Sequence, residues 1–118
     1  MRSALLVDAT LLDDRAAPFL KRMALADVPV VPLQPPWLPR TLAMALRSAG
    51  AGTGWLICRD PQAVAAAATA GLAGVVLIGC PPPADDHGIV AASASDLADA
   101  PRVMVPRDGG CWHEHRAP

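Results

Sequence analysis

Short apolar runs alternate along this chain with longer stretches in which apolar residues recur at helical spacing. Continuous apolar runs of about four to eight residues are typical of strands buried on both faces of a parallel sheet. The run at 28–31 contains Pro29, which cannot donate a ladder hydrogen bond, so we expect it at a sheet edge or a strand start. The pattern predicts strands at 4–7, 28–31, 55–58, 74–78 and 102–105.

The stretches between these strands have the spacing of amphipathic helices. Asp13 and Asp14 can cap the first helix, and Gly71 ends the third. Strands joined by helices of this length imply right-handed crossovers. We therefore predict an α/β fold at 1–106, a three-layer doubly wound (Rossmann-like) domain with a parallel sheet of about five strands, followed by a polar tail at 107–118. The expected helices are 15–26, 38–49, 61–70 and a short one at 95–100, the last capped by Ser93 or Ser95.

The carboxyl ends of the expected strands are where a ligand would bind, because doubly wound sheets hold their ligands beyond these ends. In this chain the corresponding segments are 8–10, 33–36, 59–62 and 79–86. The polar side chains there that we take as the candidate ligand site are Asp8, Thr10, Gln34, Arg59 and Asp60.

The composition argues against several classes of protein. The 118 residues carry a net charge of −1, and no long run of one sign favours binding to nucleic acid or to anionic lipid. The charge-free stretch 61–84 is divided by Pro61, Gly71 and Gly74, so we expect no membrane span. No signal-peptide core follows Met1 and the 3 cysteines are an odd number, so we expect a cytoplasmic protein without disulfides.

The low charge content points to a partner. Only 18% of the residues are charged and 53% are hydrophobic, whereas an average soluble domain has about 25% charged residues. A small domain has much surface for its volume and needs polar residues to cover it. We therefore expect apolar surface that is covered by a protein partner or by a second copy of the chain.

The residues around the first expected strand carry a likeness to a known family. The segment Leu-Leu-Val-Asp-Ala-Thr-Leu at 5–11 resembles the haloacid dehalogenase (HAD) superfamily, in which an apolar strand is followed by Asp-x-Asp-Gly-Thr-Leu. Aligned on Thr-Leu, the family's second Asp falls on Asp8 and its Gly on Ala9. The first Asp, which is the family's nucleophile, falls on Leu6. The resemblance extends from residue 4 to about residue 106.

A second segment, 55–78, is similar to the family's motif of a strand, Gly-Asp-x-x-x-Asp, an Ala-rich helix and another strand. Aligned on the Ala-Gly pair after the helix, the metal-binding Asp pair falls on Arg59 and Ala63, and Asp60 lies one position away. The family's Lys, which precedes a Pro, best matches Gln34. The insertion that forms a cap domain in many members is absent, because only about seventeen residues separate Thr10 from the second expected strand.

The resemblance thus implies a phosphatase whose catalytic residues have been lost. Phosphoryl transfer in the family needs a carboxylate nucleophile and Mg²⁺ held by further carboxylates. Leu6 cannot attack, and Arg59 would repel Mg²⁺ although it can contact an anion. We therefore predict no catalytic residue, cofactor or metal. The leading hypothesis is a non-catalytic HAD-like domain that acts as an interaction or accessory subunit in a protein complex.

Two alternatives stay open. A one-residue shift would let Asp8 act as nucleophile and Asp60 as a Mg²⁺ ligand in a small phosphatase; otherwise Asp8 accepts backbone N–H bonds at its strand end, and Asp60 caps the next helix. The other alternative is a metal-binding accessory protein. Cys111, His113 and His115 occupy every second position and would share one side of an extended chain, but no fourth ligand is close in sequence.

Two tryptophans are the candidate contact sites for a protein partner. Trp37 lies in a Pro-rich connection and Trp112 in the polar tail, and tryptophan is enriched at interface hot spots. Trp37 fits the hydrophobic core equally well, and the sequence does not separate these two interpretations. The polar group at 85–87 follows three prolines, so we interpret it as a solvated loop.

Overall fold

The central feature of the computed structural model, which describes residues 3–104, is a five-stranded sheet in which all strands are parallel. The strands lie in the order β2-β1-β3-β4-β5. In this doubly wound order the winding reverses between β1 and β3, which makes that pair the topological switch point. The strands are β1 (Ser3–Asp8), β2 (Val30–Leu33), β3 (Thr53–Cys58), β4 (Gly74–Ile78) and β5 (Val90–Ala94).

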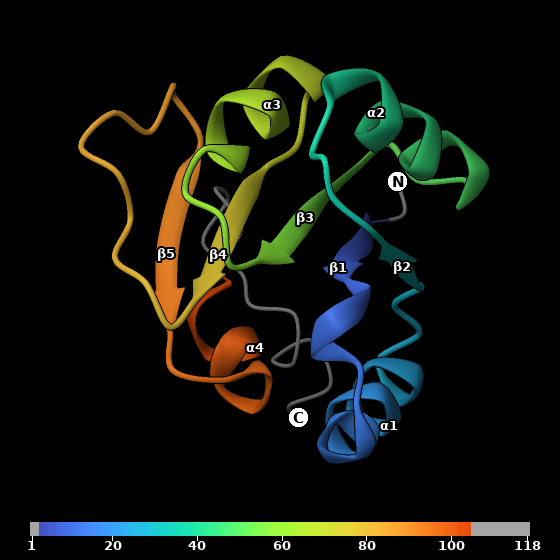
Figure 1. The fold of residues 1–118 in the computed structure, drawn as a ribbon. Coiled ribbons are helices and arrows are strands. Elements are labelled where there is room, and N and C mark those ends of the chain that lie inside the picture. The colour runs from blue at the N-terminus through green and yellow to red at the C-terminus, as the bar shows by residue number, and fades with distance from the viewer. Residues whose placement is uncertain (1–2, 105–118) are drawn as a thin grey trace, which may run out of the picture.

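Helices cover both faces of the sheet. Helices α2 (Pro39–Ser48) and α3 (Ala63–Ala70) lie on one face, and α1 (Ala17–Leu25) and the short α4 (Ala100–Val103) lie on the other (Figure 1). The prediction of a three-layer α/β domain with a parallel sheet is therefore confirmed. Three short 3₁₀ helices complete the described elements: η1 (Ala9–Leu11), η2 (Asp14–Ala16) and η3 (Leu97–Asp99).

The core consists of two layers because successive strand residues point to opposite faces of the sheet. Leu6 and Leu56 pack with α2 and α3, whereas Leu5, Trp55 and Ile57 pack with α1 and α4. Burying a large apolar side chain stabilises the fold by about 1.5–3 kcal/mol. Both faces of the central strands are buried, which is why these strands appear as continuous apolar runs in the sequence.

The ends of several helices follow the predicted signals. The side chain of Asp13 accepts the N–H of Arg15 at 2.9 Å and caps η2, which leads into α1. Gly71 ends α3 in the left-handed conformation, with φ of 85°, where a residue with a Cβ would be strained. Pro39 occupies the first turn of α2, where its missing N–H costs no helical hydrogen bond.

Two strand predictions need correction. The second strand is Val30–Leu33, two residues later than expected, because Pro29 only precedes the ladder. The fifth strand expected at 102–105 is wrong, since Arg102 and Val103 belong to α4. Its place beside β4 is taken by Val90–Ala94, whose alanine and serine residues carry no strong strand signal. The short helix expected at 95–100 is represented by η3 and α4, and Asp96 supplies its cap in place of Ser93 or Ser95.

Strand β2 forms one edge of the sheet, as expected for the proline-containing run. The carbonyl of Pro29 accepts the N–H of Leu5 at 2.9 Å, which sets the alternation of backbone groups along β2. Val30 and Pro32 are then the residues of β2 whose backbone groups face away from β1. Pro32 is exposed at this edge.

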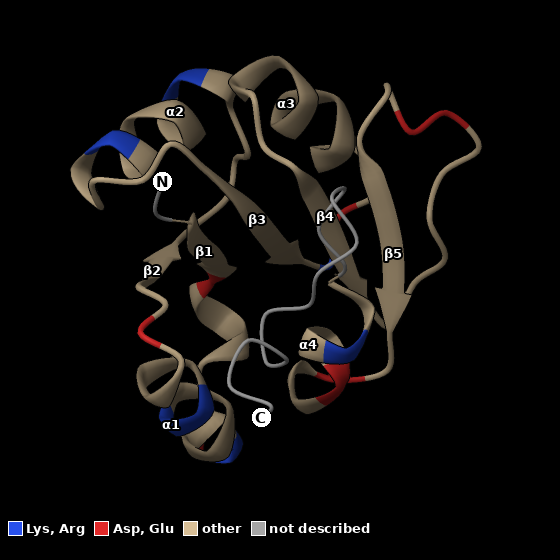
Figure 2. Ribbon diagram, turned by 180° about the vertical axis from the view of Figure 1, so that it is seen from behind, with Lys and Arg blue, Asp and Glu red and all other residues tan. Residues whose placement is uncertain are grey.

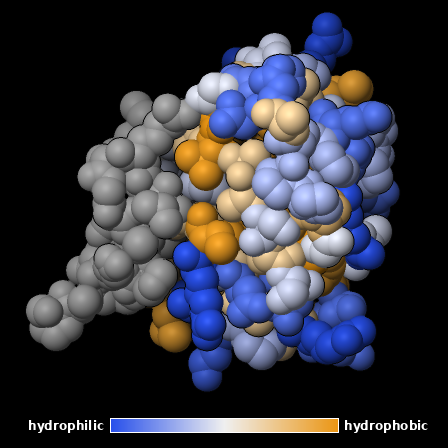
Figure 3. Space-filling model, turned by 90° about the vertical axis from the view of Figure 1, so that its left-hand side faces the viewer, coloured by the Kyte–Doolittle hydropathy of each residue, from blue (hydrophilic) through white to orange (hydrophobic). Residues whose placement is uncertain are grey.

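The described surface mixes polar and apolar residues. Apolar residues form separate patches on the face shown in Figure 3, outside the grey atoms. The large exposed apolar side chains are divided between two helices on opposite faces of the sheet: Leu20 and Leu25 on α1, and Leu38 and Met44 at α2. Within residues 3–104, none of the helices has the length and apolar character needed to cross a membrane.

Candidate functional site

The carboxyl ends of β1 and β3 meet at the topological switch point, where doubly wound sheets bind their ligands. Asp8 ends β1 at this place and is the only charged residue in the described strands, seen as the red end of β1 in Figure 2. Only 6% of its surface is exposed. A carboxylate that is buried this deeply needs hydrogen-bond donors close by.

Thr10 supplies those donors. Its backbone N–H and its side-chain hydroxyl both donate to Oδ1 of Asp8, at 2.9 and 2.8 Å. Asp8 thereby caps η1, the short helix that follows β1. The alternative in which Asp8 accepts a backbone N–H at its strand end is confirmed.

Arg59 joins this group from the neighbouring strand. It follows the last residue of β3, and its Nη2 donates to the hydroxyl of Thr10 at 2.9 Å and to the Thr10 carbonyl at 3.3 Å. A guanidinium, a hydroxyl and a buried carboxylate thus form a continuous chain of hydrogen bonds across the switch point. We call this chain the Arg59–Thr10–Asp8 relay.

The other two candidate residues are not part of the relay. Asp60 accepts the N–H of Gln62 at 2.9 Å through Oδ1, in the turn before α3. The predicted role of Asp60 as the N-cap is wrong, because α3 begins at Ala63 and its N-cap is Gln62. Gln34 follows β2 at the same edge of the sheet and is exposed. Within the described part of the chain, Gln34 has no hydrogen bond to the other candidate residues.

The structure also locates the residues aligned with the family's nucleophile. Leu6 lies two residues before the carboxyl end of β1 and is fully buried. It pairs with Val31 and Leu56 on the neighbouring strands. Asp8, on which the family's second Asp falls, is the last residue of the same strand.

This set of side chains does not fit a Mg²⁺ site. Magnesium needs several oxygen ligands in octahedral geometry, usually including one or two carboxylates. One oxygen of Asp8 is held by Thr10 and one oxygen of Asp60 by Gln62, and the guanidinium of Arg59 brings a positive charge to the same edge. In residues 3–104, no three His, Cys, Asp or Glu side chains converge on a common point.

A buried thiol that was not among the candidate residues lies at the same carboxyl edge of the sheet. Cys58, the last residue of β3, is fully buried and its Sγ donates to the carbonyl of Asp60 at 3.6 Å. Burial raises the pKa of the Cys58 thiol to about 12, partly offset by that hydrogen bond and reinforced by the charges of Asp60 and Asp8. The half-exposed Cys80 donates its own thiol to the carbonyl of Arg59 at 3.3 Å. Cys58 is therefore a protonated packing residue at neutral pH and not a nucleophile.

We expect Cys58 to resist alkylation in the folded protein. With a pKa of about 12, only about one thiol in ten thousand is ionised near pH 8, and the thiolate is the reactive form. In a Cys111→Ser background, iodoacetamide followed by peptide mass spectrometry should label Cys80 well before Cys58. In urea the two cysteines should react at similar rates, and equal labelling of both in the folded protein would contradict the burial of Cys58.

The same pKa predicts a loss of stability at high pH. The unfolded thiol ionises near pH 9 while the folded thiol stays protonated up to about pH 12. The free energy of unfolding should therefore fall by about 1.4 kcal/mol for each pH unit between these values. A Cys58→Ala variant, compared in urea titrations, should lack this contribution.

The tryptophan expected as a partner contact lies in the core. Trp37 is 9% exposed and belongs to the cluster that packs α2 and α3 on the sheet. Leu38 is the N-cap of α2, so Trp37 and Leu42 occupy the N′ and N4 positions, the arrangement of a hydrophobic staple. The structure therefore supports the core interpretation and not an exposed anchor at this position.

Trp112 and the candidate ligands Cys111, His113 and His115 lie outside the described residues.

Comparison of the chain with known protein families, with curated protein sequences and with solved structures finds no match. The fold class therefore rests on the structure, and the candidate site rests on its own geometry.

Proposed function

We propose that this chain is a non-catalytic, HAD-like domain of the cytoplasm that works as a binding or accessory subunit, and that Arg59 receives an anionic group of its ligand or partner. The observation that carries this proposal is the Arg59–Thr10–Asp8 relay. It commits the buried carboxylate to a structural role and holds a guanidinium at the switch point, where ligands bind in folds of this class.

The guanidinium of Arg59 has donors left for a ligand. Only its Nη2 is engaged with Thr10, and among residues 3–104 neither Nη1 nor Nε has a hydrogen-bond acceptor. Residue 59 is exposed at the surface. The free N–H groups on Nη1 and Nε point to different edges of the planar guanidinium group, and each can donate a charge-assisted hydrogen bond to a carboxylate or a phosphate.

The same geometry argues against hydrolysis. An aspartyl-phosphate forms only if a free carboxylate oxygen can attack in line, with metal ions neutralising the charge that develops. Asp8 is 6% exposed and tied to Thr10, and the described side chains do not form a Mg²⁺ site. Binding without turnover is the function that remains for this edge of the sheet.

A protein partner or a second copy of the chain is the second part of the proposal. Only 18% of the residues are charged, and two large apolar side chains are strongly exposed, Leu25 at 75% and Met44 at 58%. Side chains of this kind gain free energy when a partner removes them from water. A strictly monomeric protein at high concentration, together with a pull-down that recovers no partner, would contradict this part.

The anion site can be tested by NMR with inorganic phosphate as the probe. At constant ionic strength, phosphate should shift the amide resonances of Thr10, Arg59 and Asp60 in a saturable manner. Arg59→Gln should weaken this binding at least about tenfold, since a charged hydrogen bond contributes about 1.5–3 kcal/mol. Arg47→Gln is the matched control, because Arg47 is an exposed arginine in the last turn of α2. Equal binding by both variants would contradict the proposed site.

The proposed lack of phosphatase activity is tested separately. With Mg²⁺ and a generic aryl phosphate, the wild-type protein should release no more phosphate than buffer alone. Turnover that is lost in Asp8→Asn, with the fold intact by circular dichroism, would overturn the proposal and support the alternative, a small Mg²⁺-dependent phosphatase with Asp8 as its nucleophile.

A further inference from the structure

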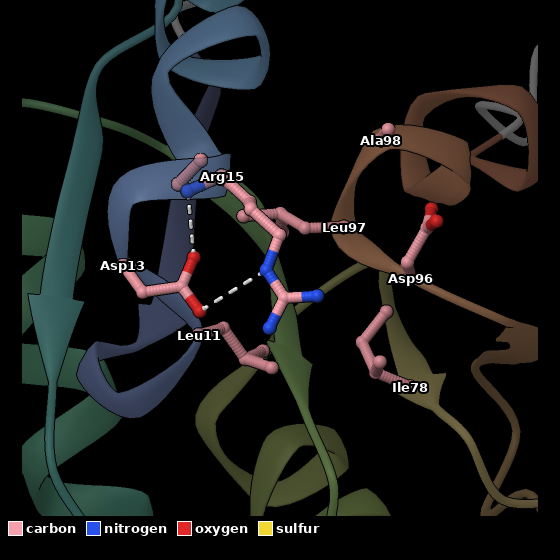
Figure 4. Close-up of a pocket in the computed structure, with 8 residues that line it drawn as sticks. Leu11, Asp13, Arg15, Ile78, Asp96, Leu97 and Ala98 are labelled. Atoms are coloured by element: carbon pink, nitrogen blue, oxygen red, sulfur yellow. Dashed lines mark hydrogen bonds and ion pairs between the residues drawn. The ribbon is translucent and has the colours of Figure 1, made fainter.

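A hollow lies near the carboxyl ends of the strands, apart from the Arg59–Thr10–Asp8 relay. It is on the face of the sheet that α1 and α4 cover. Here the segment 11–16 and the segment 96–98 border a hollow of about 190 Å³, with the end of β4 between them. Figure 4 shows Arg15 extending over this hollow, with Asp13 on one side and Asp96 on the other.

The hollow combines an apolar floor with charges of both signs. Leu11, Ile78 and Leu97 supply apolar lining, and Asp13, Arg15 and Asp96 supply the charged groups. The charged side chains are only partly satisfied by one another. Oδ1 of Asp13 accepts the backbone N–H of Arg15 at 2.9 Å, while its Oδ2 is 4.0 Å from Arg15 Nε.

The charged side chains therefore keep atoms that can form hydrogen bonds with a ligand. The side chain of Arg15 is 94% exposed, and among residues 3–104 its two terminal nitrogens have no hydrogen-bond acceptor. Asp96 uses Oδ1 to accept the N–H of Asp99 at 3.0 Å, and in the same part of the chain no donor reaches its Oδ2.

The charges select among ligand classes. A simple anion that paired with Arg15 would also meet the carboxylates of Asp13 and Asp96, and a simple cation that paired with these would meet the guanidinium. A ligand that carries both charges can satisfy both groups, while an apolar side chain covers the floor. We propose that this hollow binds a small zwitterion with an apolar side chain, that is, an aliphatic α-amino acid.

The size of the hollow agrees with a ligand of this kind. Pockets for drug-sized molecules have volumes of about 300–1,000 Å³, and the 190 Å³ here is smaller. For so few ligand atoms, we expect a dissociation constant of about 1 mM. This proposal involves none of the residues of the Arg59–Thr10–Asp8 relay, so it stands or falls separately from the proposed function.

The test uses three probes that differ by one charged group. NMR titration of the full chain with L-leucine should give saturable shifts of the Leu11, Leu97 and Ala98 amides. 4-Methylpentanoate, which lacks the ammonium group, and 3-methylbutylamine, which lacks the carboxylate, should each bind at least about tenfold more weakly. If either of them binds as tightly as leucine, the two-charge site is wrong.

Variants separate the two charged contacts. Arg15→Gln and Asp96→Asn should each weaken leucine binding at least about tenfold, and Asn still caps η3 because it is as good an N-cap as Asp. Arg47→Gln at the far end of α2 is the control and should change the affinity less than twofold. Unchanged binding in Arg15→Gln, or no saturable shift at these amides with about 20 mM leucine, where a site of this affinity would be largely occupied, would overturn the proposal.

Discussion

Replacing Leu6 by Asp, which restores the carboxylate that the HAD resemblance expects at that position, should strongly destabilise the protein and not produce a phosphatase. Leu6 is fully buried between β2 and β3, and its side chain packs beneath α2 and α3. A carboxylate there would have no donors prepared for it, and burying such a group costs several kcal/mol. We expect the free energy of unfolding in urea to fall by about 4 kcal/mol or more at neutral pH, against a total of about 5–15 kcal/mol.

Leu6→Ala is the control for lost packing, which by itself costs about 2–5 kcal/mol. The excess cost of Leu6→Asp over Leu6→Ala should depend on pH. Burial raises the pKa of a carboxyl group above its unfolded value of about 3.9, so the excess should be smallest near pH 4 and grow as the pH rises. An excess that does not change between pH 4 and pH 7 would contradict the burial of this position.

Gly54→Ala should also be strongly destabilising. Gly54 lies in β3 opposite Ala4 of β1, and a Cβ at this position would overlap the carbonyl oxygen of Ala4 and lie 2.9 Å from Cδ2 of Leu46. The carbonyl is part of the backbone of the central strand pair and cannot move without disturbing the ladder. We expect a loss of about 3 kcal/mol or more, measured by urea denaturation.

Gly50→Ala separates this overlap from the conformational cost of replacing glycine. Gly50 has a positive φ of 70°, and a methyl group added there would meet no atom within 4 Å, so only backbone strain of about 1 kcal/mol is expected. A similar loss in both variants would show that β1 and β3 are not as close as the structure has them.

The strands of the sheet centre could be predicted from the sequence because they are buried on both faces. The segment 74–78 is apolar throughout and bounded by glycines, and it forms β4 as expected. The edge strand Val90–Ala94 was not predicted. Three of its five residues are alanine and one is serine, and these residue types have little preference for strands. The apolar residues after 101 suggested a strand, but Pro101 stands in the first turn of a short helix.

The position of the candidate site at the carboxyl edge and its local interactions were predictable from the sequence, but its one long-range contact was not. The interactions of Asp8 with Thr10 and of Asp60 with Gln62 span two residues each, and both follow from the turn-forming habit of aspartate. The contact between Arg59 and Thr10 spans 49 residues, and it depends on β1 and β3 being neighbours in the sheet. Only the strand order, which the sequence does not state, brings these two side chains together.

Pro32 has a consequence for how the sheet behaves toward other chains. An edge strand offers its outward N–H and C=O groups as a template on which a strand from another molecule can add, and repeated addition leads to fibrils. In β2 the outward-facing residues are Val30 and Pro32, so Val30 alone offers an outward N–H. This side of the sheet is thereby a poor template for strand addition, and the proline ring at position 32 limits aggregation at this edge.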